Sequence, residues 1–420
     1  MESFKNKVLA VFLSCVLALG SLFARVFPMQ ENAASFDNVN LGAGYEVAVP
    51  KCAGTRVFNR VSLSYSADAP VRMQYSYLTK DGDVCEEELL LSEKETEASQ
   101  LLDCFLSGKT ALRLQKLRFS PIEQRTDCRF TLRSLRLSKQ SVPNDTIYLE
   151  NARFKLGVKL SWGGGISEFY DKSQRRYGNL LNQYDTGRMV QQSFYGPTMI
   201  PDYENGWYSD QIWCYNPVQG GDQYGNASKL VAVEQSDRQI TVVCRPLDWA
   251  KNNVPTQTLF KSVYTLTETG VKAENTAIDF LQTPWAPRDQ ELPALYTLSA
   301  LGNFVFYDGD APWTDAPLRY ERELPFWGGQ KGFALGENTE TWCAWVDGSD
   351  YGVGLYSPTA TRLLAGRFGA DGSADSNAPS TNYVAPVAKL ALSFGEPFRY
   401  EYRFTAGTVQ EIRAVFRELH

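Results

Sequence analysis

Apolar side chains recur at every second position through much of this chain, in short runs that end at turn residues. Val61, Leu63 and Tyr65, for example, alternate with serines. Successive side chains of an extended strand point to opposite faces, so this period predicts strands with one buried face. Similar runs lie at 229–233, 239–245, 260–267 and 388–394. The pattern predicts an all-β fold built from antiparallel sheets.

One segment departs from this period, at the C-terminus. Thr408 and Glu411 have the spacing of a helix capping box. The residues that follow place one apolar stripe at helical spacing: Val409, Ile412, Phe416 and Leu419. We expect an amphipathic helix whose stripe docks on the β core.

The β-rich chain divides at a polar, proline-containing joint at residues 140–145. We expect a β-sandwich module at 36–140 and a larger antiparallel sandwich at 146–420, which includes the helix. Within the module, the runs at 112–119 and 130–137 each slip phase by one residue, which predicts a β-bulge in each. In the larger domain, the glycines at 163–165 lie between two predicted strands and indicate a tight hairpin.

The first 30 residues have the layout of an export signal. Lys5 and Lys7 precede an apolar run from Val8 to Ala24, and Arg25 follows it. We expect a cleaved signal peptide, with an uncleaved N-terminal anchor as the alternative. The protein is then secreted or extracytoplasmic, and this segment is its one expected contact with a membrane.

Histidine is nearly absent from the 420 residues. The one histidine, His420, is the last residue. Mechanisms that need an internal imidazole, such as a Ser/His/Asp triad or a His-ligated zinc, are therefore excluded. Four cysteines lie between Cys52 and Cys128, where up to two disulfides could form in an oxidising compartment.

Charge gives no sign of a nucleic-acid partner. The formal net charge is -6, although residues 108–139 hold nine Lys or Arg and two acidic residues. Most of these basic residues occupy the outward positions of alternating strands, so a solvated strand face explains them better than a polyanion site.

Four loops between the predicted strands carry many polar and aromatic side chains: 185–196, 221–226, 245–255 and 287–296. Amide, carboxylate and guanidinium groups pair with sugar hydroxyls, and indole rings stack on pyranose faces. We therefore expect a carbohydrate site. Its predicted substrate-contacting residues are Arg188, Gln191, Gln192, Tyr195, Trp207, Trp213, Tyr224, Asn226, Asp248, Trp249, Arg288 and Tyr296.

Two carboxylates in the last loop are separated by one residue. In extended backbone, Asp289 and Glu291 point to the same side, and Arg288 and Gln290 to the other. Carboxyl groups that face one site can divide into a proton donor and an ionised base or nucleophile. Asp289, Glu291 and, from across the site, Asp185 are the predicted catalytic residues.

The same loops resemble a group of secreted bacterial proteins, commonly taken as glycosidase-like. The shared pattern begins Asp-x-Gly-Arg-x-Val-Gln-Gln-Ser-x-Tyr, at 185–195, and ends Arg-Asp-Gln-Glu-Leu-Pro-Ala-x-Tyr, at 288–296. Between them lie Tyr-Gly-Asn at 224–226 and Arg-Pro-x-x-Trp-Ala-x-Asn-Asn-Val-Pro at 245–255. The resemblance implies a galactose-mutarotase-type supersandwich, and the first module is similar to a jelly-roll carbohydrate-binding module. Mutarotases use a histidine with a glutamate, so the missing histidine argues against aldose epimerisation.

The sequence thus favours a glycoside hydrolase that acts on an oligo- or polysaccharide with paired carboxylates. One alternative is a polysaccharide lyase with Tyr195 or Tyr296 as base and Arg188 or Arg288 neutralising a substrate carboxylate. Another is a surface or envelope protein that binds glycans without cleaving them. No cofactor or metal is expected, although the Asp-rich loops leave a structural calcium open.

Overall fold

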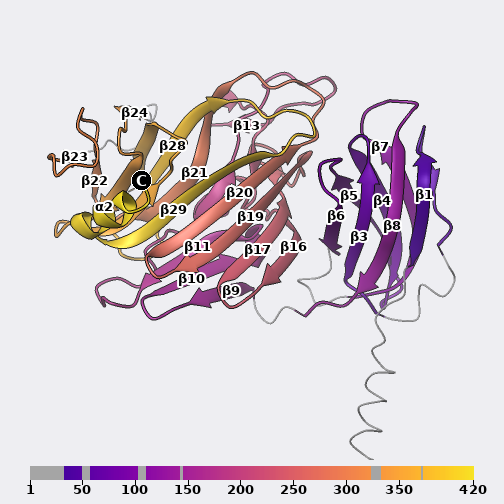
Figure 1. Cartoon of the computed structure of the whole chain (residues 1–420), viewed down its shortest axis with the longest axis horizontal. Helices are drawn as coiled ribbons and strands as arrows, with labels where there is room; N and C mark the ends of the chain where they lie inside the picture. Colours follow the sequence, from indigo (N-terminus) through magenta and orange to yellow (C-terminus); the bar gives the residue numbers. More distant parts are fainter. Residues whose placement is uncertain (1–32, 50–56, 103–109, 142–144, 323–332, 370–371) are drawn as a thin grey trace, which may run out of the picture.

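The computed structural model describes residues 33–49, 57–102, 110–141, 145–322, 333–369 and 372–420. Strands dominate these residues, and all pairs between the named strands are antiparallel. A smaller and a larger β-sandwich lie side by side, and the C-terminal helix lies on the larger one (Figure 1). The prediction of an all-β fold with a C-terminal helix is confirmed.

The smaller sandwich consists of two four-stranded sheets. One has the order β1 (Ala34–Asn40), β8 (Arg129–Ser138), β3 (Arg60–Ala67), β6 (Glu97–Leu101). The other has the order β2 (Tyr45–Glu46), β7 (Ala111–Pro121), β4 (Val71–Thr79), β5 (Val84–Leu91). Val61, Leu63 and Tyr65 are buried between the sheets, as their alternation predicts. Register shifts in the β4–β7 and β3–β8 pairs confirm both predicted bulges.

The larger sandwich faces a ten-stranded sheet against a nine-stranded one. The ten-stranded sheet runs β24 (Phe333–Glu337), β27 (Arg362–Phe368), β28 (Thr381–Leu390), β21 (Arg288–Leu298), β12 (Val190–Ser193), β11 (Gly165–Asp171), β10 (Phe154–Lys159), β9 (Thr146–Glu150), with β15 (Pro217–Val218) paired to β12 and β18 (Leu247–Asp248) paired to β15. The nine-stranded sheet runs β16 (Lys229–Gln235), β17 (Gln239–Arg245), β19 (Thr258–Thr267), β20 (Gly270–Asp279), β29 (Phe398–Thr408), β26 (Tyr351–Tyr356), β25 (Trp342–Val346), β22 (Asn303–Phe306), β23 (Arg319–Glu321). A small hairpin, β13 (Trp207–Tyr208) and β14 (Gln211–Ile212), stands apart from both sheets.

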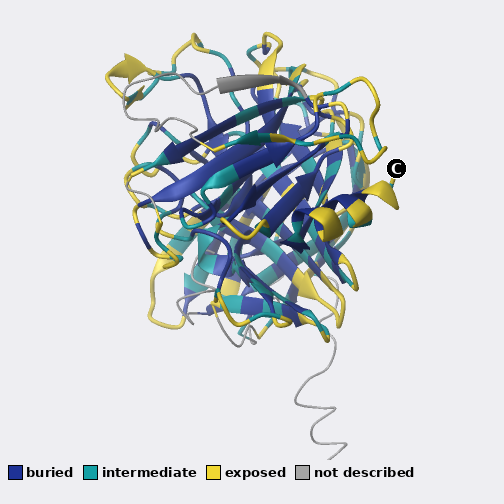
Figure 2. Ribbon diagram, turned by 90° about the vertical axis from the view of Figure 1, so that its left-hand side faces the viewer, coloured by how far each residue is buried: buried dark blue, intermediate teal, exposed yellow. Residues whose placement is uncertain are grey.

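The core of the larger domain fills the space between its two sheets. Phe169 stacks on Phe154, with ring centroids 5.2 Å apart, and meets Phe404 of the opposite sheet edge-on at 4.8 Å. Each fully buried aromatic side chain contributes about 2–3 kcal/mol through removal of apolar surface from water. Buried residues occupy the interior, and exposed ones concentrate in the connecting loops (Figure 2).

Two local predictions in this domain are also confirmed. β10 and β11 form an antiparallel hairpin through the short 3-10 helix η1 (Leu160–Trp162) and the three glycines. Gly163 has a φ of 58°, and a Cβ there would lie 2.0 Å from the Gln219 carbonyl oxygen, so no larger residue fits. Helix α2 (Val409–Arg417) begins with both hydrogen bonds of the Thr408–Glu411 capping box.

The outer face of the nine-stranded sheet packs against the smaller sandwich, beginning at β16 and β6 (Figure 1). Val231 of β16 joins the hydrophobic core of the smaller sandwich. Ion pairs fix the contact: Lys229 Nζ lies 2.7 Å from Glu87 Oε2, and Arg245 lies 2.7 Å from Glu88 Oε1. The two sandwiches therefore share an interface that combines an apolar contact with ion pairs.

The N-terminal segment and part of the cysteine framework lie outside the described residues. This applies to the predicted signal or anchor at 1–30, and to Cys52 and Cys104. The five described cysteines are free thiols: Cys85, Cys128, Cys214, Cys244 and Cys343. No helix in the described ranges is long and apolar enough to cross a membrane.

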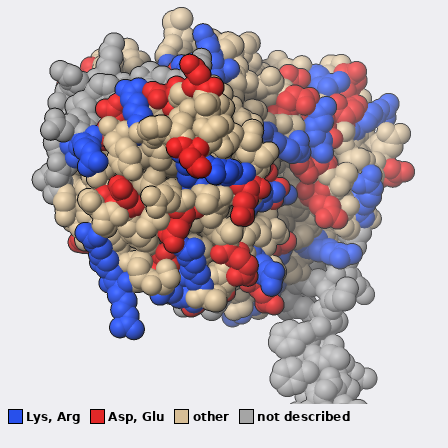
Figure 3. Space-filling model, turned by 60° about the vertical axis from the view of Figure 1, so that its left-hand side comes forward, with Lys and Arg blue, Asp and Glu red and all other residues tan. Residues whose placement is uncertain are grey.

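Charges on the face shown in Figure 3 are of both signs and interspersed, without a patch of one sign.

A buried carboxylate at the end of β20 predicts a pH-dependent stability. Asp279 is fully buried and accepts hydrogen bonds from Thr258 Oγ1 at 2.8 Å and Trp285 Nε1 at 2.9 Å. Burial raises the pKa of Asp279 from 3.8 to about 7. Because the folded state then binds a proton that the unfolded state has lost, this carboxyl stabilises the fold at low pH, and its contribution falls as pH rises from about 4 to about 7.

We expect Asp279→Asn to remove this dependence, since an amide does not titrate and its oxygen can still accept the hydrogen bond from Thr258 Oγ1. Relative to the variant, the wild-type free energy of unfolding should fall by about 3 to 4 kcal/mol between pH 4 and pH 8. Urea unfolding at a series of pH values measures this difference, with Asp237→Asn at an exposed position as the control. Parallel curves for the wild type and Asp279→Asn would contradict the prediction.

Candidate active site

The candidate site lies on the outer face of the ten-stranded sheet, where β12, β21 and β28 are neighbours. At its centre, Glu291 of β21 pairs with Ser193 of β12 and with Val387 of β28. A second row across the sheet pairs Tyr296 of β21 with Tyr383 of β28, and their rings are 5.0 Å apart. This face is separate from the core between the two sheets.

Glu291 is a buried carboxylate held by two phenols. Its exposed fraction is 5%, and its Oε1 accepts hydrogen bonds from the Tyr195 hydroxyl, at 2.9 Å, and from the Tyr383 hydroxyl. Burial raises the pKa of Glu291, although the hydrogen bonds oppose the shift. Burial and the nearby carboxylate raise the pKa of Tyr195 and Tyr383 well above 10, so both phenols keep their protons and donate to Glu291.

Arg288 and Gln290, on the other side of β21 from Glu291, bond to the backbone around Tyr195. Gln290 accepts from the Tyr195 backbone N–H at 2.7 Å and donates to the Tyr195 carbonyl at 2.9 Å. Arg288 donates to the Gly196 carbonyl at 2.9 Å. These bonds fix the backbone that carries Tyr195, so Arg288 and Gln290 position a partner of Glu291.

Asp289 lies on the same side of β21 as Glu291 but in a different environment. Its side chain is 50% exposed, and both carboxylate oxygens pair with the Arg362 guanidinium of β27. A bidentate arginine engages both oxygens of the carboxylate it binds. The geometry therefore separates the two predicted catalytic residues of β21 and favours Glu291.

Asp185 and Arg188 come from the loop before β12. Asp185 Oδ1 accepts from the Gly187 N–H at 2.9 Å, and its Oδ2 lies 3.6 Å from Arg188 Nε. Burial and the charge of Glu291 raise the pKa of Tyr296 well above 10. The charge of Asp185 adds to this shift, and the charge of Arg188 opposes it.

Aromatic side chains form one wall beside these residues. The Tyr208 ring meets Trp213 at 5.0 Å and Trp249 at 5.7 Å, and Trp213 meets Tyr195 at 6.3 Å. Gly187 allows Trp249 to approach, because a Cβ there would lie 2.5 Å from the indole. Contacts therefore run without a break from the hairpin β13–β14 to Glu291.

Other predicted contact residues lie at the rim or inside the fold. Trp207 is 59% exposed and Tyr224 is 57% exposed. Their loops are joined, since Gln223 donates to the Trp207 carbonyl at 2.7 Å. Asn226 donates to Asp222 within its own loop and to Asn252 of the 245–255 loop, each at 2.8 Å.

Three predicted residues are buried and bonded to the protein itself. Gln191 donates to the Thr186 and Arg188 carbonyls, and Gln192 donates to Lys261 and Ser262. Asp248 accepts from the Tyr203 hydroxyl and the Asn216 N–H. Burial raises the pKa of Asp248. These three side chains support the loops, and we assign them no direct contact with a substrate.

The sequence reasoning missed Tyr383 and Tyr208. Tyr383 lies in a mostly apolar strand that carries no mark of a site, and its role depends on the pairing of β28 with β21. Tyr208 directly follows Trp207, so the density of aromatic residues was the one signal available for it. Within the described ranges, no three His, Cys, Asp or Glu side chains converge in a way that could hold a metal ion.

Comparison with known proteins gives structural neighbours. No family model matches the sequence, and no curated protein is similar to it. Among solved structures, a galactose mutarotase-related enzyme from Lactobacillus acidophilus has 11% identity and a TM-score of 0.40, and the match covers 63% of this chain and 97% of that one. A galactose mutarotase-like protein from Lactobacillus casei has 14% identity and a TM-score of 0.37, with 62% and 100% covered. The 4-alpha-glucanotransferase from Thermococcus litoralis has 12% identity and a TM-score of 0.34, with 62% of this chain and 37% of that one covered. Galactose mutarotase-like proteins are thus among the structural neighbours of this chain, at identities that concern the fold alone.

Proposed function

We propose that the protein is an exported glycoside hydrolase in which Glu291 donates the proton to the leaving oxygen. The observation that carries the proposal is the state of Glu291: a buried carboxyl with a raised pKa, oriented by Tyr195 and Tyr383. A general acid of this kind keeps its proton at a pH where exposed carboxyls are ionised.

The second carboxylate in the proposal is Asp185. Its side chain is 41% exposed and its Oδ2 lies 3.6 Å from Arg188 Nε, and we assign it the role of base or nucleophile. The separation of the two carboxyl groups around the bound sugar would decide between inversion and retention. Asp289 has no catalytic role in this proposal, because Arg362 already neutralises it.

Substrate binding is assigned to the wall and rim around Glu291. Trp213 and Trp249 provide indole faces for sugar rings. The Arg188 guanidinium already donates to Asn182 Oδ1 and to the Pro379 carbonyl, so it supports the loop beside them. Trp207 and Tyr224 extend the aromatic surface outward, which suits an oligo- or polysaccharide better than a single sugar.

The lyase alternative is less favoured by the same geometry. A tyrosine base must lose its proton to act, but burial raises the pKa of Tyr195 and Tyr296. A phenol whose pKa lies well above 10 is rarely ionised at neutral pH.

A digest of plant, microbial and host glycans by the chain without residues 1–30 tests the proposal. New reducing ends without the ultraviolet absorbance of an unsaturated uronide are expected. Unsaturated products would replace hydrolysis with elimination. Binding without any product would favour a glycan-binding protein and overturn the enzymatic proposal.

The dependence of activity on pH should report Glu291. Since the acid must be protonated, kcat/KM is expected to fall as pH rises through its raised pKa. Tyr383→Phe removes a hydrogen bond that lowers this pKa, so the alkaline limb should move to higher pH. Tyr320→Phe, in β23, is the control. A limb that stays in place or moves to lower pH in Tyr383→Phe would argue against Glu291 as the acid.

A further inference from the structure

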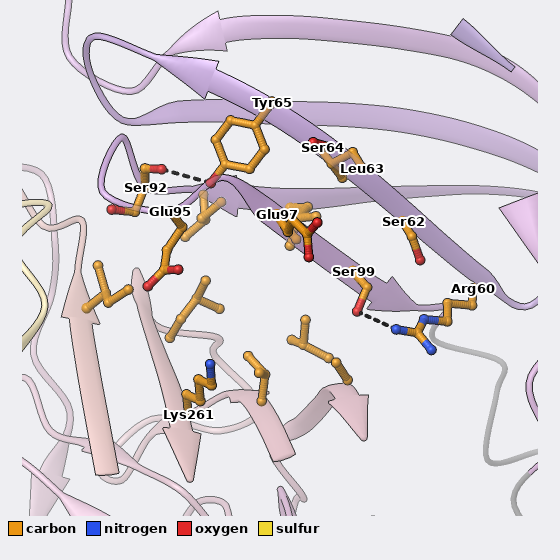
Figure 4. Close-up of a pocket in the computed structure, with 18 of the residues that line it drawn as sticks. Arg60, Ser62, Leu63, Ser64, Tyr65, Ser92, Glu95, Glu97, Ser99 and Lys261 are labelled. Atoms are coloured by element: carbon orange, nitrogen blue, oxygen red, sulfur yellow. Dashed lines mark hydrogen bonds between the residues drawn. The ribbon is translucent and has the colours of Figure 1, made fainter. Parts of the chain in front are cut away.

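A cavity of about 650 Å³ lies between the two sandwiches, away from Glu291. Its volume is in the range typical of ligand sites, roughly 300–1,000 Å³. One wall is the outward face of β3, β6 and β8, and the other is the outward face of β16, β17, β19 and β20 (Figure 4). We call it the interdomain groove.

Contacts between the two sandwiches lie on both sides of the groove. Near one side, Arg60 lies 3.1 Å from Glu234, and Gln140 donates to the Val233 carbonyl at 2.8 Å. Ser92, on the opposite side of the view in Figure 4, donates to the Gly395 carbonyl at 3.3 Å. The groove is therefore bounded by contacts that cross the interface, and its width is set by the fold.

The two walls differ in chemistry. The wall from the smaller sandwich presents serine hydroxyls at Ser62, Ser64, Ser99 and Ser134. The wall from the larger sandwich is mainly aliphatic, with Val231, Val243, Leu259 and Ile278. A ligand that fills this space needs many hydroxyl groups on one side and a C–H face on the other, which is the character of a sugar ring.

Charges in the groove are nearly balanced. Four basic side chains and three acidic ones line it. Among the described residues, Glu97, Arg136 and Lys261 have no ion-pair partner, and Figure 4 shows Glu97 and Lys261 approaching the space from opposite walls. An acidic ligand would be repelled by the three glutamates, and a basic ligand by the three arginines and the lysine. The mixture therefore favours a neutral ligand that both donates and accepts hydrogen bonds.

We propose that the interdomain groove is a second carbohydrate site, which binds a neutral oligosaccharide independently of catalysis at Glu291. Its walls come from both sandwiches, so the ligand also ties the two domains together. The proposal goes beyond the glycoside hydrolase assignment, because the groove shares no lining residue with the candidate active site.

Calorimetric titration of the Glu291→Gln protein tests this without turnover. The probes are cellohexaose, xylohexaose, mannohexaose, laminarihexaose and chitohexaose, with an acidic oligogalacturonate for comparison. At least one neutral probe should bind. Lys261→Ala, which removes an unpaired cation, should weaken that binding about tenfold through loss of a charged hydrogen bond. Ser62→Trp, which fills the groove, should weaken it at least as much.

Two controls separate the groove from the active site. Ser120→Trp places the same bulk on β7, outside the groove, and should leave the affinity unchanged. Trp213→Ala, in the active-site wall, should leave the groove event in place while it weakens any binding beside Glu291. The proposal is overturned if no neutral probe binds, if the oligogalacturonate alone binds, or if all binding survives both Ser62→Trp and Lys261→Ala.

Discussion

Glu291→Gln is expected to lower kcat on the preferred glycan by roughly 10²- to 10⁴-fold, the usual contribution of a positioned general acid. Glutamine has nearly the same shape and can still accept hydrogen bonds from Tyr195 and Tyr383, but it has no proton to transfer. The substitution also replaces a buried carboxyl with a neutral group, so the fold should keep its stability. The loss should therefore fall on kcat and leave the affinity for substrate within a few-fold of the wild type.

Asp289→Asn is the matched control for this experiment. It makes the same chemical change two residues away on the same side of β21, where Arg362 rather than tyrosines holds the carboxylate. We expect it to retain activity within a few-fold. Equal losses in the two variants would contradict the assignment, and so would full activity in Glu291→Gln. A leaving group that needs no protonation, such as a nitrophenolate, should restore part of the activity of Glu291→Gln but not alter Asp289→Asn.

The contrast between these two carboxylates shows how far the sequence could lead. Alternation places Asp289 and Glu291 on one side of a strand, and this holds in the structure. Which of them is buried depends on β27 and β28, whose residues are about seventy to a hundred positions further along the chain. Arg362 and Tyr383 have no local pattern that marks them as partners, so strand pairing had to be known first.

The interdomain groove illustrates the same limit. Ser62 and Ser64 alternate with the buried residues Val61, Leu63 and Tyr65, and the sequence therefore predicts only that they face outward. The groove exists because a face of the larger sandwich lies opposite them. Features set by short-range spacing, such as the strand period, the bulges and the capping box, could be predicted, whereas those set by contacts between distant strands could not.

Arg413→Met is expected to destabilise the protein by about 3–5 kcal/mol, because it leaves a buried charge without its partner. Arg413 is 8% exposed and makes two hydrogen bonds to Glu340, at 3.0 and 2.5 Å. Glu340 has no exposed surface and also accepts from Trp342 Nε1 at 2.6 Å and from the Trp313 N–H at 2.7 Å. These contacts fasten α2 to the nine-stranded sheet, so their loss should be felt by the whole larger domain.

Arg417→Met is the control for this prediction, since it removes a neighbouring arginine of the same helix. Arg417 pairs at 2.9 Å with Asp315, whose side chain is 95% exposed, and a solvated pair of this kind contributes little to stability. Urea unfolding of both variants gives the comparison, and similar losses would contradict the assignment of Glu340 and Arg413 as the anchor of α2. The double variant Glu340→Gln/Arg413→Met no longer buries an unpaired charge, so it should be more stable than Arg413→Met alone. That recovery would show that the cost arises from the isolated carboxylate and not from the lost packing of the arginine side chain.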